Sequence, residues 1–299
     1  GSSKTMVTNS TGPLKNIPTQ NSAGPRGRRP RVNTSGYGKN LFSKAFGEIE
    51  NGTTLTLEGK EIRNIINNTT YAASKDDLKP VLQGVLFKIN EEGFVSVATD
   101  GHRLVKFEKT NVNTNNFNGT VVVPTKFLIL LNSLLEGKEN TSMVVGENHI
   151  QIEIKNVIIT SRIIKETFPD YEGVIPKDNE HTLIVDKNNF REAVKRVSIF
   201  SNKTSKQVAL NISENNLIIT TEDPENITSG KEEIDCEYQG EPMIIGYNAS
   251  YLKEVLQHQE STEIKILLKS PLNAGLFLPI EQEQNENKTT LLMPIRLND

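Results

Sequence analysis

Residues 55–69 read Leu-Thr-Leu-Glu-Gly-Lys-Glu-Ile-Arg-Asn-Ile-Ile-Asn-Asn-Thr, and the spacing of the apolar side chains changes within this stretch. Leu55 and Leu57 alternate with threonines, which is typical of a strand with one buried face. The positions that follow have the spacing of one helix face: Ile62, Ile65, Ile66 and Thr69. The stretch therefore predicts a strand that leads directly into an amphipathic helix.

The same pattern occurs again 128 residues later, where residues 183–186 precede a helix pattern with Phe190, Ala193, Val194 and Val197. After a five-residue deletion, the copies match at an offset of 123. At that offset Val85, Phe87, Ile89, Glu91, Phe94, Val95 and Asp100 fall on Val208, Leu210, Ile212, Glu214, Leu217, Ile218 and Asp223. Val122 falls on Ile245, just before a second helix in each copy. Chance similarity of amphipathic segments is the alternative, and the shared register argues against it.

Short strand-like runs lie between the two helices of each copy and after the second one. In the first copy they cover residues 85–89, 94–98, 104–107, 121–123, 149–154 and 157–164. The predicted fold class is therefore α+β, with two helices packed on antiparallel sheets in each copy. We place the copies at residues 49–180 and 181–299.

Residues 1–48 are predicted to be a flexible, disordered tail or the remnant of another unit. The first 40 residues hold seven Lys or Arg and no acidic residue, which leaves 27 basic and 37 acidic residues in the rest of the chain. The tail therefore carries +7 and the body −10. A segment with few apolar residues cannot offset its ordering entropy. The acidic body argues against nucleic-acid binding through its whole outer surface, so contact with DNA would need a local basic face.

The composition predicts a cytoplasmic protein. One cysteine, Cys236, excludes an internal disulfide and indicates a reducing compartment. The longest apolar run, residues 127–131, is far shorter than the roughly 20 residues that a membrane-spanning helix needs. The four histidines are scattered, without the spacing of a metal site, so we expect no metal and no cofactor.

Residues 99–103 read Thr-Asp-Gly-His-Arg, in which Asp100 and His102 have the spacing of a possible acid–base pair. A hairpin turn explains the string better: Asp100 caps the turn, Gly101 takes a positive φ angle, and the next strand follows. A hydrolase that uses Asp100 and His102 is therefore the remote alternative, and we expect no enzymatic activity.

Cationic side chains follow one face of a helix in each copy. Lys187, Arg191 and Lys195 are spaced at i, i+4 and i+8, and Arg63 holds a similar place in the first copy. Together with Lys126 at the start of the next helix, they are the candidates for contact with DNA phosphates. Such contacts do not depend on base sequence. For any single helix, the alternative is that the cationic side chains only face solvent and contact no DNA.

Five ordered strings show a family resemblance: residues 79–85, 98–104, 168–176, 245–248 and 293–297. With them the chain resembles the bacterial sliding clamp, the beta subunit of replicative DNA polymerase III, from about Ile49 onward. The resemblance implies three copies of one domain per subunit, with helices facing duplex DNA, and a homodimer closed into a ring. Residues 49–180 and 181–299 are similar to the second and third domains, and no first domain is recognisable.

The resemblance also implies a hydrophobic groove between these two domains that binds short linear peptides of partner proteins. By position, one wall holds Leu82, Thr99, Gly101, His102, Arg103, Leu104, Pro169 and Val174. The other wall holds Asn248, Tyr251, Met293, Pro294, Ile295, Arg296 and Leu297. An apolar pocket with a few polar groups suits an extended peptide with apolar anchors.

The resulting hypothesis is a sliding clamp, a processivity factor for DNA replication that tethers the polymerase to DNA. Its expected partners are duplex DNA, the replicative polymerase, the clamp loader and other replication or repair proteins, but no membrane. Because ring closure in the family uses the first domain, the homodimer is doubtful here. The alternative is a truncated clamp that binds peptides without encircling DNA.

Overall fold

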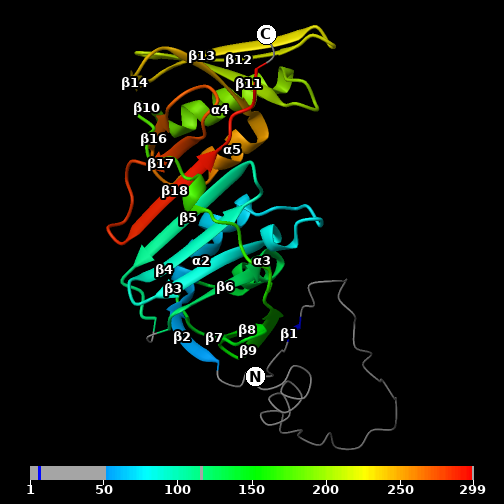
Figure 1. Cartoon of the computed structure of the whole chain (residues 1–299), viewed down its shortest axis with the longest axis vertical. Helices are drawn as coiled ribbons and strands as arrows, with labels where there is room; N and C mark the ends of the chain where they lie inside the picture. Colours follow the sequence, from blue (N-terminus) through cyan, green and yellow to red (C-terminus); the bar gives the residue numbers. More distant parts are fainter. Residues whose placement is uncertain (1–5, 8–51, 115–116, 298–299) are drawn as a thin grey trace, which may run out of the picture.

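A computed structural model describes residues 6–7, 52–114 and 117–297. It has the predicted α+β fold, with two copies of one strand and helix unit arranged end to end (Figure 1). The predicted tail at residues 1–48 lies outside the described residues except for Met6–Val7, which form strand β1. None of the helices in the described ranges is long and apolar enough to cross a membrane.

The first copy begins with the predicted strand and helix. Its elements are β2 (Thr53–Glu58), α2 (Gly59–Thr69), η1 (Thr70–Ala72), η2 (Pro80–Gln83), β3 (Gly84–Asn90), β4 (Gly93–Thr99), β5 (Arg103–Thr110), β6 (Gly119–Pro124), α3 (Thr125–Leu134), β7 (Asn140–Val145), β8 (His149–Ile154) and β9 (Val157–Arg162). The turn η3 (Glu172–Val174) lies between the copies. Helix α2 starts where the Glu61 carboxylate accepts the backbone N–H of Glu58, which satisfies a free donor of the first turn.

The second copy repeats this order. Its elements are β10 (His181–Asp186), α4 (Lys187–Val197), η4 (Ser198–Phe200), β11 (Gln207–Ser213), β12 (Asn216–Asp223), β13 (Thr228–Asp235), β14 (Glu237–Gln239), β15 (Met243–Asn248), α5 (Ala249–Gln257), β16 (Glu263–Leu268), β17 (Gly275–Pro279) and β18 (Glu286–Leu292). Helix α4 begins at Asp186, whose carboxylate accepts the N–H of Asn189 at 2.7 Å.

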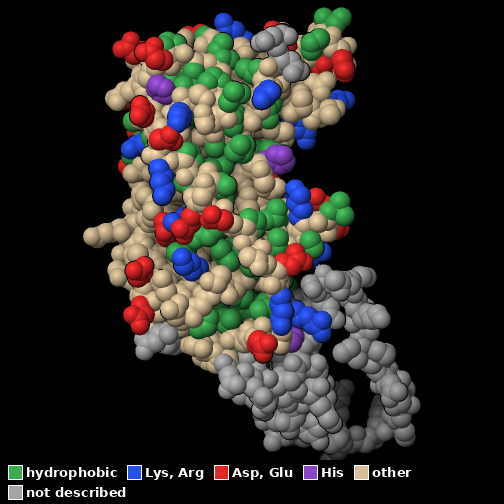
Figure 2. Space-filling view, in the orientation of Figure 1, with side chains coloured by type: hydrophobic (Ala, Val, Ile, Leu, Met, Phe, Trp, Pro, Cys, Tyr) green, Lys and Arg blue, Asp and Glu red, His purple; other side chains and the backbone are tan. Residues whose placement is uncertain are grey.

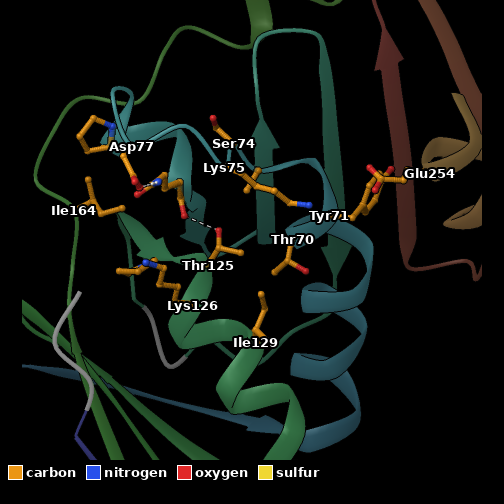
Figure 3. Close-up of a pocket in the computed structure, with 14 residues that line it drawn as sticks. Thr70, Tyr71, Ser74, Lys75, Asp77, Thr125, Lys126, Ile129, Ile164 and Glu254 are labelled. Carbon is orange, nitrogen blue, oxygen red and sulfur yellow. Dashed lines mark hydrogen bonds between the residues drawn. The ribbon is translucent and has the colours of Figure 1, made fainter. Parts of the chain in front are cut away.

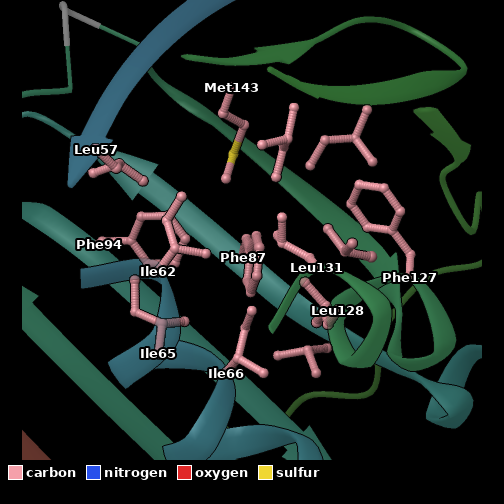
Figure 4. Close-up of a cluster of buried hydrophobic side chains, with 14 of the residues drawn as sticks. Leu57, Ile62, Ile65, Ile66, Phe87, Phe94, Phe127, Leu128, Leu131 and Met143 are labelled. Atoms are coloured by element: carbon pink, nitrogen blue, oxygen red, sulfur yellow. The ribbon is translucent and has the colours of Figure 1, made fainter. Parts of the chain in front are cut away.

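Each copy has its own core between its helices and two sheets. In the first copy Ile62, Ile65 and Ile66 of α2 and Phe127, Leu128 and Leu131 of α3 pack with strand residues such as Phe87 and Phe94 (Figure 4). In the second copy the predicted helix positions Phe190, Ala193, Val194 and Val197 are all buried. The hydrophobic spacing therefore identified the buried face of each helix correctly.

One register prediction was wrong by a residue. The β3–β6 ladder places Phe87 opposite Val121, and the β11–β15 ladder places Leu210 opposite Ile245. Because Leu210 is the counterpart of Phe87, Ile245 is the counterpart of Val121, not of Val122. Val121 and Ile245 lie in the two equivalent cores, whereas Val122 faces the opposite side of its sheet. A shift of one residue in a strand exchanges its two faces.

The two copies share one sheet. Its strand order is β14-β10-β16-β17-β18-β5-β4-β3-β6, and β18 of the second copy pairs antiparallel with β5 of the first. Seven residue pairs form this junction, from Arg103 opposite Leu292 to Lys109 opposite Glu286. The other two sheets do not cross between the copies: β1-β9-β8-β7-β2 contains strands of the first copy and β1, and β13-β12-β11-β15 contains strands of the second. The continuous sheet fixes the position of one copy against the other.

The segment between the copies crosses the outer face of the shared sheet. Tyr171 is buried there with Leu104 of the first copy and Leu291 of the second, and Phe168 and Ile175 pack against them. This third cluster joins side chains from both copies. Apolar burial therefore supports the junction in addition to its backbone hydrogen bonds.

Candidate functional site

Arg103, the first residue of β5, joins the two copies through a buried charge. Its side chain is 4% exposed, and its Nε lies 3.2 Å from Asp100 Oδ2 on its own turn. Nη1 lies 2.5 Å from Glu254 Oε2 on helix α5 of the other copy, and Nη2 donates to the carbonyl oxygen of Tyr71 at 2.8 Å. A buried guanidinium needs such partners to offset its desolvation, so these contacts hold the two copies together at this point.

Tyr71 of η1 packs against the cores of both copies. Its ring is stacked on that of His258, with centroids 3.8 Å apart and an interplanar angle of 6°. The guanidinium carbon of Arg103 lies 5.5 Å from the Tyr71 centroid and 4.9 Å from that of Tyr251. Burial raises the pKa of Tyr71 to about 12, so the hydroxyl stays protonated near neutral pH.

Lys288 of β18 is a second buried cation at the same junction. Its side-chain amine donates to Asn68 Oδ1 of α2 at 2.7 Å and to the carbonyl oxygen of His258. Burial lowers the pKa of this amine to about 8, and the charge of Glu260 opposes that effect. The junction between the copies, which we call the seam, is thus a continuous sheet flanked by two buried cations and Tyr71.

The Thr99–Arg103 turn is a hairpin, as predicted. Asp100 Oδ1 accepts the backbone N–H groups of His102 and Arg103, at 2.9 and 3.1 Å. Gly101 has a φ of 92°, and Thr99 Oγ1 donates to the carbonyl oxygen of Arg103. The Asp100 carboxylate is therefore occupied by its own turn and by Arg103, which argues against the hydrolase alternative.

The C-terminal segment lies beside this turn. The N–H of Met293 donates to the carbonyl oxygen of His102 at 2.9 Å, and the N–H of Ile295 donates to that of Gly246 on β15. A side chain at Gly246 would come within 2.7 Å of the Ile295 carbonyl oxygen and also meet Leu297. Glycine at this position therefore lets residues 293–297 pass closely over the sheet.

Helix α5 supplies the opposite side of the site. Asn248 caps the helix by accepting the N–H groups of Ser250 and Tyr251. The ring of Tyr251 faces the imidazole of His102, with centroids 5.5 Å apart. The structure thus brings the predicted wall residues His102, Arg103, Tyr251 and Met293 together where the copies meet, and the surface is hollowed at mid-height (Figure 2).

The other predicted groove residues differ in how far their side chains are exposed to a ligand. Val174 and Met293 are exposed, at 56% and 43%, and Pro169 and Arg296 are exposed as well. Leu82, Thr99 and Leu104 are buried, so they support the surface from beneath. Pro294, Ile295, Leu297 and Asn248 are half-buried.

A cavity of about 900 Å³ lies next to the seam on the helix side, between the end of α2 and the start of α3 (Figure 3). It is lined by Tyr71 and Glu254 of the seam and by the cations Lys75 and Lys126. Lys126 was predicted as a DNA-facing residue, and its side chain is exposed here.

The other predicted DNA-facing cations already have hydrogen-bond or ion-pair partners. Arg191 and Lys195 both contact the Glu192 carboxylate, at 3.0 and 3.3 Å, and the hydrogen bond from Arg191 is the main cause of the lowered pKa of Glu192. Lys187 donates to the carbonyl oxygen of Gln259, and Arg63 to that of Leu135. The cationic face on α4 is therefore weaker than the sequence alone indicates.

Comparison with known proteins identifies the family. A family model for the central domain of the DNA polymerase III beta subunit matches residues 56–170, and the model for its C-terminal domain matches residues 172–296. The chain belongs to the DNA polymerase III beta subunit family. These matches bear out the sliding-clamp prediction and do not favour the truncated-clamp alternative.

Individual relatives and solved structures that resemble the chain are also sliding clamps. The beta sliding clamp of Pseudomonas putida is 30% identical over 261 residues, which covers 86% of this chain and 70% of that clamp. The crystal structure of DNA polymerase III subunit beta from Pseudomonas aeruginosa matches with a TM-score of 0.79 at 29% identity, covering 85% of this chain and 70% of that one. A sliding clamp from Bartonella birtlesii bound to griselimycin matches with a TM-score of 0.76 at 28% identity, covering 82% and 66%. The chain thus spans about two thirds of these clamps.

Sequence reasoning missed the seam residues Tyr71, Glu254, His258 and Lys288. They are dispersed along the chain, and their types form no recognised motif. The one available signal was the internal repeat, which places the aromatic Tyr71 directly after α2, where the second copy has Ile199 after α4. Within the described ranges, no three or more His, Cys, Asp or Glu side chains gather in a way that would hold a metal ion.

The buried amine of Lys288 predicts a specific pH dependence of stability. Its pKa is about 8 in the folded chain against the usual 10.5, so the folded state binds fewer protons between these values. The cost of burying the charge is full below pH 8 and disappears as the pH rises toward 10.5. Relative to Lys288→Met, the free energy of unfolding of the wild type is expected to rise by up to ~3 kcal/mol over this range. Urea denaturation at several pH values measures it, and a flat difference would contradict the lowered pKa.

Proposed function

We propose that this chain is a non-catalytic sliding clamp that binds partner peptides in the groove at the seam and surrounds duplex DNA with its helices inward. The observation that carries the proposal is the seam geometry. The turn at residues 99–103 and the segment at residues 293–297 are joined by the Met293–His102 hydrogen bond, and they come from different copies. A ligand placed between them would contact both copies at once.

Several features support a peptide as the ligand of the groove. Met293 and Val174 provide exposed apolar side chains, and a thioether adapts to anchors of different shape. The imidazole of His102 and the ring of Tyr251 add a partly polar, flat surface between them. Arg103 is committed to Asp100 and Glu254, so its role is to hold the walls in place.

Duplex DNA is the proposed partner of the helix side. The exposed Lys126 and Lys195 are the strongest candidates. Lys195 pairs with Glu192 but its side chain stays 64% exposed, whereas Arg63 and Lys187 are bound to backbone carbonyl groups. Contacts of this kind reach phosphates and are independent of base sequence. The net negative charge of the body limits binding to this local face.

The remaining parts of the proposal follow from this role. The domains are residues 49–180 and 181–299, after a tail at residues 1–48, and the protein acts in the cytoplasm. Its partners are the replicative polymerase, the clamp loader and other replication or repair proteins that carry short clamp-binding peptides. Encircling DNA requires a closed ring, for which the family resemblance implies a homodimer.

Truncation of an exposed groove side chain tests the peptide site. Met293→Ala is expected to weaken binding of a fluorescent clamp-binding peptide by about 1–2 kcal/mol, roughly 5- to 30-fold, because it removes an apolar anchor. Fluorescence anisotropy measures the affinity. Ile244→Ala is the matched control, since Ile244 is a similarly exposed apolar residue on β15. Equal affinities of wild type and Met293→Ala would show that the groove assignment is wrong.

Removal of two exposed cations tests the DNA-facing side. The variant Lys126→Ala/Lys195→Ala is expected to bind duplex DNA more weakly, with a salt slope reduced by about 1 for each phosphate that is no longer neutralised. Filter binding at several salt concentrations gives the slope, and the affinity for the clamp-binding peptide should be unaffected. Lys269→Ala is the control. It removes a cation from the turn after β16, where Lys269 pairs with Asp178 of the segment between the copies, and it should leave the slope unchanged. An unchanged slope in the double variant would contradict the assignment.

A further inference from the structure

His258 is a titratable group inside the seam. It caps the C-terminal end of helix α5 and is half-buried, and its imidazole lies flat on the ring of Tyr71 from the first copy, with centroids 3.8 Å apart. Its carbonyl oxygen also accepts the side-chain amine of Lys288 on β18. Histidine is the side chain whose ordinary pKa lies closest to neutral pH. A contact between the two copies therefore involves a ring that changes its charge in mild acid.

The hydrogen bond of the ring decides where acid adds a proton. Nδ1 of His258 lies 2.8 Å from the carbonyl oxygen of Glu254, one turn earlier in α5. A carbonyl oxygen only accepts hydrogen bonds, so Nδ1 carries the proton of the neutral ring. The second proton therefore goes to Nε2. Acid changes the charge of the ring and leaves its hydrogen bond to α5 in place.

Burial and two neighbouring cations oppose a charge on this ring. Burial is the main reason why the pKa of His258 is lowered from the usual 6.5, and the charges of Lys288 and Arg103 lower it further. The hydrogen bond to the Glu254 carbonyl oxygen and the charge of the Glu254 carboxylate act in the opposite direction. The neutral ring is therefore the form that fits the closed seam.

The other groups around the imidazole are one aromatic ring and two opposite charges. The face of Tyr71 attracts a cation, but the guanidinium carbon of Arg103 and the amine of Lys288 already lie 5.5 and 5.9 Å from its centroid. Glu260 and Lys187 act on Lys288 with opposite sign. A charged imidazole would thus be the third cation around one tyrosine ring.

The sign of the effect follows from the direction of the pKa shift. Above pH 6.5 the ring of His258 is neutral whether the seam is closed or open, so it has no effect on the seam. As the pH falls below 6.5, the open seam binds a proton that the closed seam binds less readily, and opening becomes easier. Each unit of difference between the two pKa values makes opening about tenfold more favourable.

We propose that His258 is an acid-sensitive switch of the seam. When its ring gains a charge, it is repelled by Arg103 and Lys288, and the end of α5 separates from Tyr71. The two states are a closed seam with a neutral ring and an open seam with a charged one.

The switch reaches the groove through helix α5. Glu254, one turn before His258, pairs with Arg103, and Tyr251, two turns before it, faces His102. Separation of α5 from the first copy therefore also separates the two walls of the groove, and acid is expected to release a bound peptide. This effect on peptides rests on the proposed function, whereas opening of the seam does not.

Histidine NMR and amide hydrogen exchange test the switch without a ligand. The chain has four histidines, so the ring signals can be assigned by single substitutions. The signal of His258 is expected to titrate below pH 6.5. His258→Phe keeps an aromatic ring against Tyr71 and cannot gain a charge. The ratio of wild-type to variant exchange rates in β18 should be constant above pH 7 and rise in acid, about tenfold for each unit by which the measured pKa lies below 6.5.

Peptide affinity at pH 7.5 and 5.5 tests the link to the groove. Acid is expected to weaken binding of a fluorescent clamp-binding peptide more in the wild type than in His258→Phe. The control His181→Phe removes a histidine from β10, which β16 and β17 separate from β18, and should behave like the wild type. Circular dichroism shows whether the variants are folded. His258→Gln, which keeps a donor for the Glu254 carbonyl oxygen, replaces a variant that is not.

The outcomes separate the switch from the proposed function. A pKa of His258 at or above 6.5, or a ratio of exchange rates that does not change with pH, would overturn the switch. A rising ratio with an equal loss of peptide affinity in wild type and variant would overturn its link to the groove. Absence of peptide binding at pH 7.5 would count against the proposed function alone, because the exchange experiment still decides whether the seam opens in acid.

Discussion

The antiparallel pairing of β5 with β18 is the constraint on which the rest of the structure depends. It turns two separately folded copies into one body with a continuous sheet. Because β5 begins at Arg103 and β18 ends at Leu292, the turn before one strand and the segment after the other meet at the same end of the ladder. The candidate groove is a consequence of that register.

Buried charges make the seam specific as well as stable. Arg103 and Lys288 each bring a cation out of water, and each finds partners on both copies. Burying such groups costs several kcal/mol per ion before their interactions are counted. A displaced second copy would leave them unpaired, so we interpret the cations and Tyr71 as a device that admits one arrangement.

The sequence predicted the repeat, the helices and the hairpin at Asp100 because these depend on local spacing and turn chemistry. The β15 register was wrong by one residue, since the alternation of residues 121–123 does not distinguish the two buried faces of that strand. The groove residues came from resemblance, and residue type alone did not show that Leu104 and Arg103 are buried while Val174 is exposed. Tyr71 and Lys288 were missed because their roles arise only when two distant segments meet. Ion pairs such as those of Glu192 likewise depend on side-chain geometry.

Amide hydrogen exchange of β5 and β18 tests the central claim most directly. If the seam joins both copies into one cooperative body, the slowest amides of these strands should exchange with the same opening free energy as those of β3 and β11, which lie inside the two copies. Rapid exchange of β5 and β18 while β3 and β11 remain protected would show that the copies separate in solution. The walls of the groove would then not be held in place by the sheet.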